Sequence, residues 1–209
     1  MTYFGSQGKK PKGLPHYGSK KAIPLALNQV YFIIKQFEDN NDYRMAVLCH
    51  LLFRCIRIGD CLKTLQKHHI YNPVSGKIRE NIIFYEEKTG NLREVPINGD
   101  GFINTLEKYY DSTVQYLSKN NLLFYNKKLK TPLSTSGVRR SLSRFVGDRG
   151  IEQCSPYSFR KAGGRLMYKN HVLLTDISTV YGHCDPLVTL RYIGITPEDI
   201  KKAMEILGI

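Results

Sequence analysis

The spacing of apolar residues along the chain changes from a helical period to an alternating one and then back. Residues 23–37 carry apolar side chains three and four positions apart, which predicts an amphipathic helix. Residues 42–56 are apolar nearly all round, which predicts a helix buried at the centre of the core. Residues 77–87 and 92–97 then predict two strands, joined by the glycine-containing sequence KTGN of a hairpin turn.

Helical patterns return for the rest of the chain. They cover residues 102–117, 134–150, 157–170, 173–182 and 197–208. Pro186 favours the start of one further short helix, which carries Tyr192. The predicted fold class is mainly α with a small antiparallel β-sheet (α+β), in one domain over residues 23–195. A flexible basic arm at residues 1–22 precedes this domain, and an amphipathic helix at residues 196–209 follows it.

The charge balance favours a polyanionic partner. The 209 residues include 31 Lys and Arg against 18 Asp and Glu, a net charge of +13. A soluble basic protein without such a partner is the alternative.

No apolar run reaches the roughly 20 residues that cross a bilayer, and the basic N-terminus lacks the apolar region of a secretory signal. Five widely spaced cysteines match neither a disulfide framework nor a paired zinc motif, so we expect reduced thiols in a cytoplasmic protein.

Three short motifs place candidate reactive residues between positions 57 and 160. Arg57 follows the predicted buried helix, with Asp60 three positions later, and Lys88 lies beside the hairpin turn. Tyr157 and Arg160 are three positions apart at a predicted helix start, so both face one side, where the helix N-terminus favours an anion. Each motif alone also has an ordinary interpretation as a solvated or salt-bridged surface.

The C-terminal part adds His183 and Tyr192, nine positions apart, in the sequences YGH and TLRY. In this order the motifs resemble the tyrosine recombinase (phage integrase) family. That family has an Arg, a hairpin Lys, His-x-x-Arg, Gly-His and a Tyr nine residues beyond that His. Arg160 precedes His183 by 23 positions, which is also within the family's usual spacing. The resemblance covers roughly residues 23–209, with one departure, because Tyr157 stands where the family has the His of His-x-x-Arg.

The resemblance implies the tyrosine recombinase catalytic-domain fold and a site-specific DNA recombinase or integrase that works through a 3′-phosphotyrosyl intermediate. Tyr192 would be the nucleophile. Arg57 and Arg160 would clamp the non-bridging phosphate oxygens, a task that suits planar guanidinium groups. Lys88 would be the general acid for the departing 5′-hydroxyl, and His183 would donate a further hydrogen bond to the phosphate. No metal, nucleotide or other cofactor is required.

Tyr157 leaves alternatives open. A phenol can donate to a phosphate oxygen, but it cannot act as a base near neutral pH as imidazole can. Tyr157 therefore either contacts the phosphate or serves only in packing. The departure keeps open a catalytically silent DNA-binding module derived from a recombinase. A type IB topoisomerase-like strand relaxer, which shares the nucleophile chemistry, is the third alternative.

The implied partners are double-stranded DNA and further copies of the chain, without a membrane. We expect a tetramer on paired DNA sites and a monomer or dimer when free. By resemblance the helix over residues 134–150 would face the DNA groove, with Arg139, Arg140 and Arg144 reaching phosphates or bases; the alternative is a solvated basic face. The helix at residues 196–209 would pack on a neighbouring subunit or fold back on its own domain. Because most relatives carry a further N-terminal DNA-binding domain, we expect either a minimal recombinase or a fragment.

Overall fold

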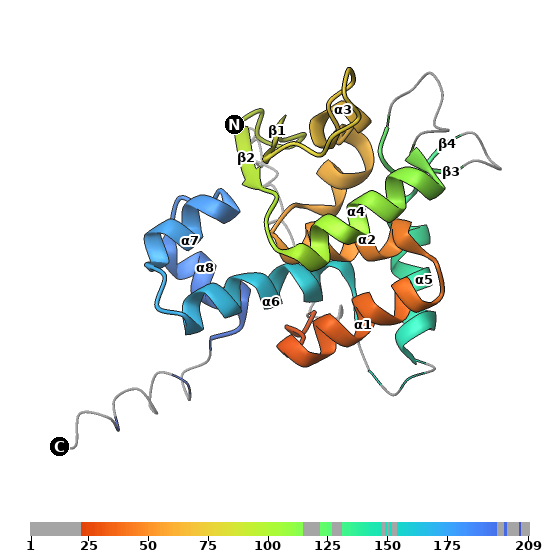
Figure 1. Cartoon of the computed structure of the whole chain (residues 1–209). Coiled ribbons are helices and arrows are strands. Elements are labelled where there is room, and N and C mark those ends of the chain that lie inside the picture. Colours follow the sequence, from red (N-terminus) through yellow and green to blue (C-terminus); the bar gives the residue numbers. More distant parts are fainter. Residues whose placement is uncertain are drawn as a thin grey trace, which may run out of the picture.

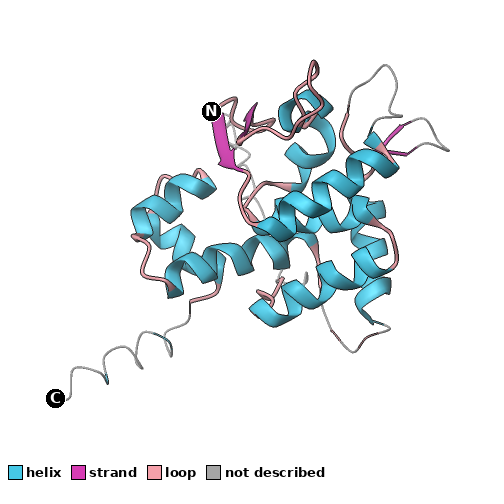
Figure 2. Cartoon of the chain, viewed as in Figure 1, coloured by secondary structure: helices cyan, strands magenta, loops and turns pink. Residues whose placement is uncertain are grey.

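The computed structural model describes residues 22–114, 122–126, 131–147 and 154–195, together with Arg149, Ile151, Asp199 and Glu205. The helices are α1 (Leu27–Asp39), α2 (Tyr43–Phe53), α3 (Lys67–Ile70), α4 (Asp100–Ser112), α5 (Thr135–Gly147), α6 (Pro156–Lys169), α7 (Leu174–Tyr181) and α8 (Pro186–Ile193), with one π-helical turn, η1 (Asp60–Thr64). The strands are β1 (Asn81–Tyr85), β2 (Leu92–Pro96), β3 (Tyr125–Asn126) and β4 (Thr131–Pro132). β1 pairs with β2 and β3 with β4, both antiparallel. The predicted fold class is confirmed, as Figure 2 shows.

Helix α2 lies at the centre of the core, as its uniform hydrophobicity predicts. It packs against α1, α4 and α6 (Figure 1). Seven of its eleven residues are buried, and the Asp42 side chain caps its start by accepting the Met45 N–H. Helix α1 turns its apolar stripe inward, and Phe37 at the end of that stripe stacks on Phe145 of α5 with ring centroids 3.9 Å apart. The amphipathic and fully apolar patterns of the sequence are therefore each matched by their burial.

Helix α6 connects this core to a smaller group formed by α7 and α8 (Figure 1). Two adjacent glycines allow its close approach on both sides. A Cβ on Gly163 would lie 2.0 Å from the carbonyl oxygen of Phe53, and one on Gly164 would lie 2.2 Å from the Tyr181 hydroxyl. Tyr181, Cys55, Ile177 and Ile193 pack together in a second, smaller hydrophobic core, formed where α7 and α8 contact α6. These contacts hold α7 and α8 against α6 and against Cys55, in the loop that follows α2.

The predicted hairpin is present, with a shorter first strand than expected. We predicted a strand over residues 77–87, whereas β1 begins at Asn81, because Ile78 forms an isolated bridge with Tyr71 instead of joining the sheet. The hairpin of β3 and β4 was not predicted. The arm at residues 1–22 lies outside the described residues apart from Ala22, and the helix at residues 196–209 apart from Asp199 and Glu205. No helix in the described part of the chain is long and apolar enough to cross a membrane.

Candidate active site

Two arginines from distant parts of the chain meet at the carboxyl-terminal end of α7. Arg57, between α2 and η1, donates through Nη2 to the carbonyl oxygen of Tyr181 at 2.9 Å. Arg160, on α6, donates through its own Nη2 to the same oxygen at 3.4 Å. The last carbonyls of a helix have no partner within it and form its negative end, so this oxygen attracts both guanidinium groups. Gly182 caps the helix at φ 67°, and a Cβ there would lie 3.3 Å from Arg57 Nη2.

Arg160 is held by its surroundings and is only 4% exposed. Its Nε donates to the carbonyl oxygen of Cys55 at 3.0 Å, and its guanidinium carbon lies 4.8 Å from the centroid of the Tyr181 ring. The Tyr181 hydroxyl in turn donates to the carbonyl oxygen of Arg160 at 2.5 Å. Cys55 has a left-handed backbone conformation, φ 63°, which is uncommon for a residue other than glycine. This turn leads the chain from α2 directly into Arg57.

Tyr192, on α8, lies beside Arg160 and His183. Its ring centroid is 5.7 Å from the Arg160 guanidinium carbon and 5.5 Å from the His183 ring, to which it is edge-on at 73°. Within the described part of the chain its buried hydroxyl has no hydrogen-bond partner. Burial raises the pKa of this phenol, the Arg160 guanidinium opposes that rise, and Tyr157 adds to it. The hydroxyl is thus protonated and close to the Arg160 cation.

A chain of hydrogen bonds orients His183. Its Nδ1 lies 2.9 Å from Thr189 Oγ1, which lies 2.9 Å from Ser178 Oγ. Ser178 donates its one hydroxyl proton to the carbonyl oxygen of Leu174 at 2.7 Å. Thr189 therefore donates to Ser178 and accepts from His183 Nδ1. Burial lowers the pKa of His183, and the two arginines lower it further, so the neutral ring carries its proton on Nδ1 and leaves Nε2 as an acceptor.

A buried carboxylate balances the positive charge at this site. Glu86, at the end of β1, is 6% exposed, and its Oε1 lies 2.5 Å from Arg57 Nη1 and 3.2 Å from Arg93 Nη1. Burial alone would raise the pKa of Glu86, but hydrogen bonds from Arg57, Thr89 and Arg93 lower it to about 2. Glu86 is therefore a carboxylate at every pH near neutrality.

The structure brings together four of the residues that the sequence singled out, namely Arg57, Arg160, His183 and Tyr192. Tyr157 lies at the edge of this group, 39% exposed at the start of α6, close enough to Tyr192 to affect its pKa. The predicted common orientation of Tyr157 and Arg160 is therefore only partly realised, because Arg160 is buried while Tyr157 faces outward.

Lys88 lies two positions beyond Glu86, which contacts Arg57, but its own side chain is not in contact with this group. It is exposed in the turn between β1 and β2, and its side chain forms no hydrogen bond or ion pair with the residues described. Arg139, Arg140 and Arg144 are exposed on α5, whose buried side carries Val138, Leu142 and Val146. Figure 1 shows α5 and the pair α7 and α8 at opposite ends of the molecule. These three arginines therefore lie away from Tyr192.

Sequence reasoning missed several groups that build the site. Glu86 and Arg93 are ordinary charged residues of a hairpin in the sequence, and only the fold shows that Glu86 contacts Arg57 and that Arg93 contacts Glu86. An acidic residue two positions before Lys88 in a basic chain was the one available signal. The sequence carries no signal for the role of the Tyr181 carbonyl, because every residue has the same backbone carbonyl group.

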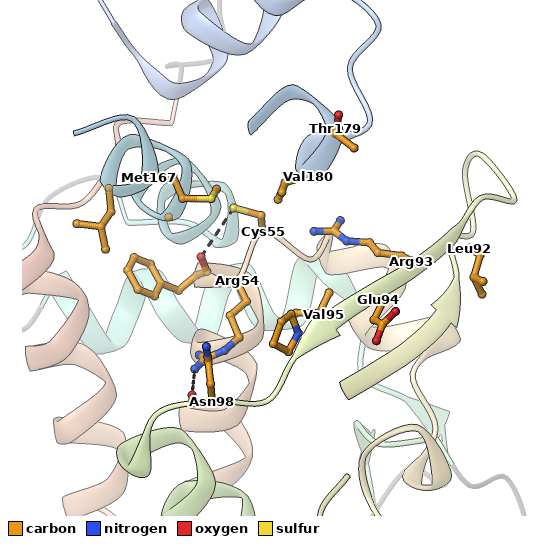
Figure 3. A pocket seen from close by; sticks show the side chains of 14 residues that line it. Arg54, Cys55, Leu92, Arg93, Glu94, Val95, Asn98, Met167, Thr179 and Val180 are labelled. Carbon is orange, nitrogen blue, oxygen red and sulfur yellow. Dashed lines mark hydrogen bonds between the residues drawn. The ribbon is translucent and has the colours of Figure 1, made fainter. Parts of the chain in front are cut away.

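A cavity of about 660 Å³ opens beside the site, between β2, the end of α2, α6 and α7 (Figure 3). Its walls are largely apolar, with Leu92, Val95, Met167 and Val180 among them. Figure 3 shows Arg93 reaching from β2 toward Val180. In the described parts of the chain, no three His, Cys, Asp or Glu side chains lie close enough together to bind a metal ion.

The chain is similar to a known protein family and to two known proteins. The model of the phage integrase family matches residues 25–198. A probable integrase/recombinase of Bacillus subtilis (strain 168), YoeC, is 24% identical over 153 residues, which cover 73% of this chain and 78% of YoeC. Tyrosine recombinase XerH of Campylobacter jejuni is 24% identical over 211 residues, which cover 98% of this chain and 55% of XerH.

Solved structures show the same fold. The crystal structure of XerA recombinase superposes with a TM-score of 0.70 at 17% identity, over 88% of this chain and 65% of XerA. XerH bound to a palindromic difH substrate, in a post-cleavage complex, gives a TM-score of 0.70 at 16% identity, over 94% of this chain and 56% of XerH. The chain thus spans between about half and two thirds of the length of these recombinases.

Proposed function

Because the chain belongs to the phage integrase family, we propose that it is a site-specific DNA recombinase that cuts and rejoins strands through a 3′-phosphotyrosyl intermediate on Tyr192. The observation that carries the proposal is the convergence of Arg57 and Arg160 on one oxygen, with the Tyr192 ring beside Arg160. Two guanidinium groups held around one acceptor are suited to the non-bridging oxygens of a phosphodiester.

The reaction makes one bond and breaks one. The Tyr192 oxygen attacks phosphorus, the bond from phosphorus to the 5′-oxygen breaks, and the phosphotyrosyl link stores the energy for rejoining. Arg57 and Arg160 would stabilise the charge that grows on the phosphate oxygens, at roughly 3 to 4 kcal/mol for each donor. Lys88 would protonate the departing 5′-oxygen from its exposed turn.

The proton of Tyr192 also needs an acceptor, and Tyr157 cannot serve as one near neutral pH. His183 supports a different assignment from the phosphate donor that the resemblance implies. Its neutral ring offers an acceptor at Nε2, since Nδ1 donates to Thr189, and it lies edge-to-face with Tyr192. We therefore assign the Tyr192 proton to His183.

The partner would be double-stranded DNA; the related XerH is bound to a palindromic difH substrate, and the Tn1549 transposon integrase is in complex with circular intermediate DNA. The net charge of +13 supports a polyanionic partner. Recombination between two DNA sites requires several active subunits, and we propose a tetramer on paired sites.

Trapping of the covalent intermediate tests the proposal. A binding site is first selected from a pool of randomised duplexes, and a nick is then placed so that the cleaved fragment diffuses away. We expect a covalent protein–DNA adduct from the unaltered chain, none from Tyr192→Phe, and a reduced yield from Tyr157→Phe. Arg160→Ala should lose cleavage far more than DNA binding.

The same assay separates the alternatives. An adduct from Tyr192→Phe would contradict the assignment of the nucleophile. Specific binding without any adduct would identify a silent DNA-binding module. Relaxation of supercoiled DNA without strand exchange between two sites would identify a topoisomerase-like enzyme.

A further inference from the structure

Glu86 connects three segments around the arginine site. Its Oε1 contacts Arg57, which precedes η1, and Arg93, which lies on β2. Its Oε2 accepts a hydrogen bond from the hydroxyl of Thr89, in the turn, at 2.7 Å. A buried carboxylate is stable only when it is paired in this way. One side chain therefore joins the hairpin turn to the first candidate phosphate-binding arginine.

The backbone on both sides of Lys88 is fixed as well. The Glu87 N–H donates to Oδ1 of the buried Asp60 in η1 at 2.9 Å, and the Gly90 N–H donates to the Glu86 carbonyl oxygen at 2.9 Å. The side chain of Lys88 is exposed and has no partner among the residues described. The turn is held at several points while the amine that it carries is free to reach a ligand.

Arg93 completes this arrangement. Its side chain is 10% exposed. Burial lowers the pKa of Arg93, and the nearby Arg160 guanidinium lowers it further, so the two cations lie close enough to repel. Glu86, between Arg57 and Arg93, supplies the negative charge that offsets this repulsion. Removal of that charge would free the hairpin to move away from the arginines.

We infer that Glu86, supported by Arg93, is a positioning residue for Lys88, which holds the turn where the Lys88 amine meets the departing 5′-oxygen. The inference rests on the proposed function. In the step concerned, the bond between Tyr192 Oη and phosphorus forms as the phenol proton passes to His183, the bond to the 5′-oxygen breaks, and a proton of the Lys88 ammonium moves to that oxygen. A misplaced Lys88 leaves an alkoxide, which is a poor leaving group.

A sulfur atom in place of the 5′-oxygen provides the discriminating substrate. A thiol has a pKa near 8.5, far below that of an alcohol, so it departs as thiolate without a proton from the protein. A defect in proton delivery is therefore repaired by the 5′-bridging phosphorothiolate. A defect in phosphate binding or in folding is not repaired.

The test compares adduct formation on the two substrates, at the selected site, for Glu86→Gln, Lys88→Ala and the double variant. Because general acids contribute roughly 10²- to 10⁴-fold, we expect Glu86→Gln to cleave the oxygen substrate at least about tenfold more slowly. It should cleave the sulfur substrate within about twofold of the unaltered chain. The double variant should be no slower than Lys88→Ala, because both changes impair the same step.

Glu87→Gln is the matched control. It removes the same charge one position along, from a carboxylate that is 44% exposed and pairs with Lys63 at 2.6 Å. We expect it to behave as the unaltered chain on both substrates, and Glu86→Gln to retain DNA affinity.

Three results would overturn the inference. They are an equal loss for Glu86→Gln on both substrates, normal cleavage of the oxygen substrate by Glu86→Gln, or additive losses in the double variant. An unaltered chain that forms no adduct with either substrate would overturn the proposed function itself, and the role of Glu86 with it. That outcome is distinguishable, because in the other three the unaltered chain is active.

Discussion

At the scale of single residues, uncharged groups organise the candidate site as much as charged ones do. The Tyr181 carbonyl oxygen accepts hydrogen bonds from both Arg57 and Arg160 and so brings the two arginines together. The Thr189 hydroxyl, which is buried, decides which nitrogen of His183 carries the proton, because its own proton is committed to Ser178. The protonation of His183 therefore depends on a neighbouring uncharged side chain.

The first prediction concerns Thr189→Val, which removes the hydroxyl and nearly preserves the shape. We expect adduct formation to slow by roughly tenfold, because the His183 ring loses its fixed acceptor and populates both tautomers. Thr189→Ser keeps the hydroxyl and should stay within about twofold of the unaltered chain. The measurement is the rate of adduct formation on the nicked site. Equal rates for the valine and serine variants would contradict the hydrogen-bond chain.

The pH dependence of adduct formation gives a second prediction, and its sign follows from the neutral state of His183. The pKa of this histidine is lowered from 6.5 by burial and by the two arginines. As a proton acceptor His183 is active when neutral, so the rate should stay level near pH 7 and fall as the pH drops through the lowered pKa. His183→Gln should abolish this acidic limb. A rate that instead increases on acidification would mean that the imidazolium donates to the phosphate.

The sequence predicted which side chains are candidate reactive groups, but it did not predict which residues surround and orient them. The nine-residue spacing of His183 and Tyr192 has physical content, since the helix cap after α7 and the short α8 place both rings in contact. Glu86 could not be assigned, because its role depends on a tertiary contact with Arg57, 29 positions earlier in the chain. The local pattern there indicates only a strand that ends in acids.

At the scale of elements, the position of α6 depends on Gly163. A Cβ at this position would lie 2.0 Å from the Phe53 carbonyl oxygen and 3.2 Å from Cys55 Sγ. The first contact is with backbone, which cannot rotate away. We expect Gly163→Ala to lower the free energy of unfolding by about 3 kcal/mol, at the upper end for overpacking, as measured by denaturant titration. The strain should also slow adduct formation, because α6 carries Arg160.

Gly101→Ala is the matched control for this third prediction. Gly101 lies in the first turn of α4, and a Cβ there would meet nothing within 4 Å. Alanine has the higher helix propensity, so this change should stabilise the fold by up to roughly 1 kcal/mol. Equal effects of the two substitutions would mean that α6 can shift away from α2 without cost.

The elements themselves were largely predictable, for reasons that differ from one to the next. The buried α2 follows from a stretch that is apolar nearly all round, and the hairpin of β1 and β2 follows from two strand patterns on either side of a glycine-containing turn. β3 and β4 were missed because each has only two residues, too few for an alternating pattern to appear. The close packing of α6 was also missed. The adjacent Gly163 and Gly164 indicate that something approaches this helix closely, but the sequence does not show which residues do so.

At the scale of the whole molecule, two groups of arginines lie at opposite ends of the described chain (Figure 1). At one end Arg57 and Arg93 contact Glu86, and Arg160 lies close to Arg93. At the other end α5 exposes Arg140 and Arg144, which line a cavity of about 420 Å³ on its surface. A DNA duplex that contacts both groups of arginines would extend along the molecule. The candidate active site would then bind one phosphate, and α5 would add affinity through contacts at the other end.

The fourth prediction separates these two contributions by salt dependence. If Arg140 and Arg144 each contact one phosphate, Arg140→Gln together with Arg144→Gln should reduce the slope of log affinity against log salt by about 1.8, since each contact contributes about 0.9. Lys35→Gln removes one cation that pairs with Asp39 at 2.8 Å on α1, and should leave the slope unchanged. The measurement is a salt titration of binding to the selected duplex. A slope that the α5 changes leave intact would mean that this face is only solvated, and that the buried arginines and other parts of the chain supply the attraction to DNA.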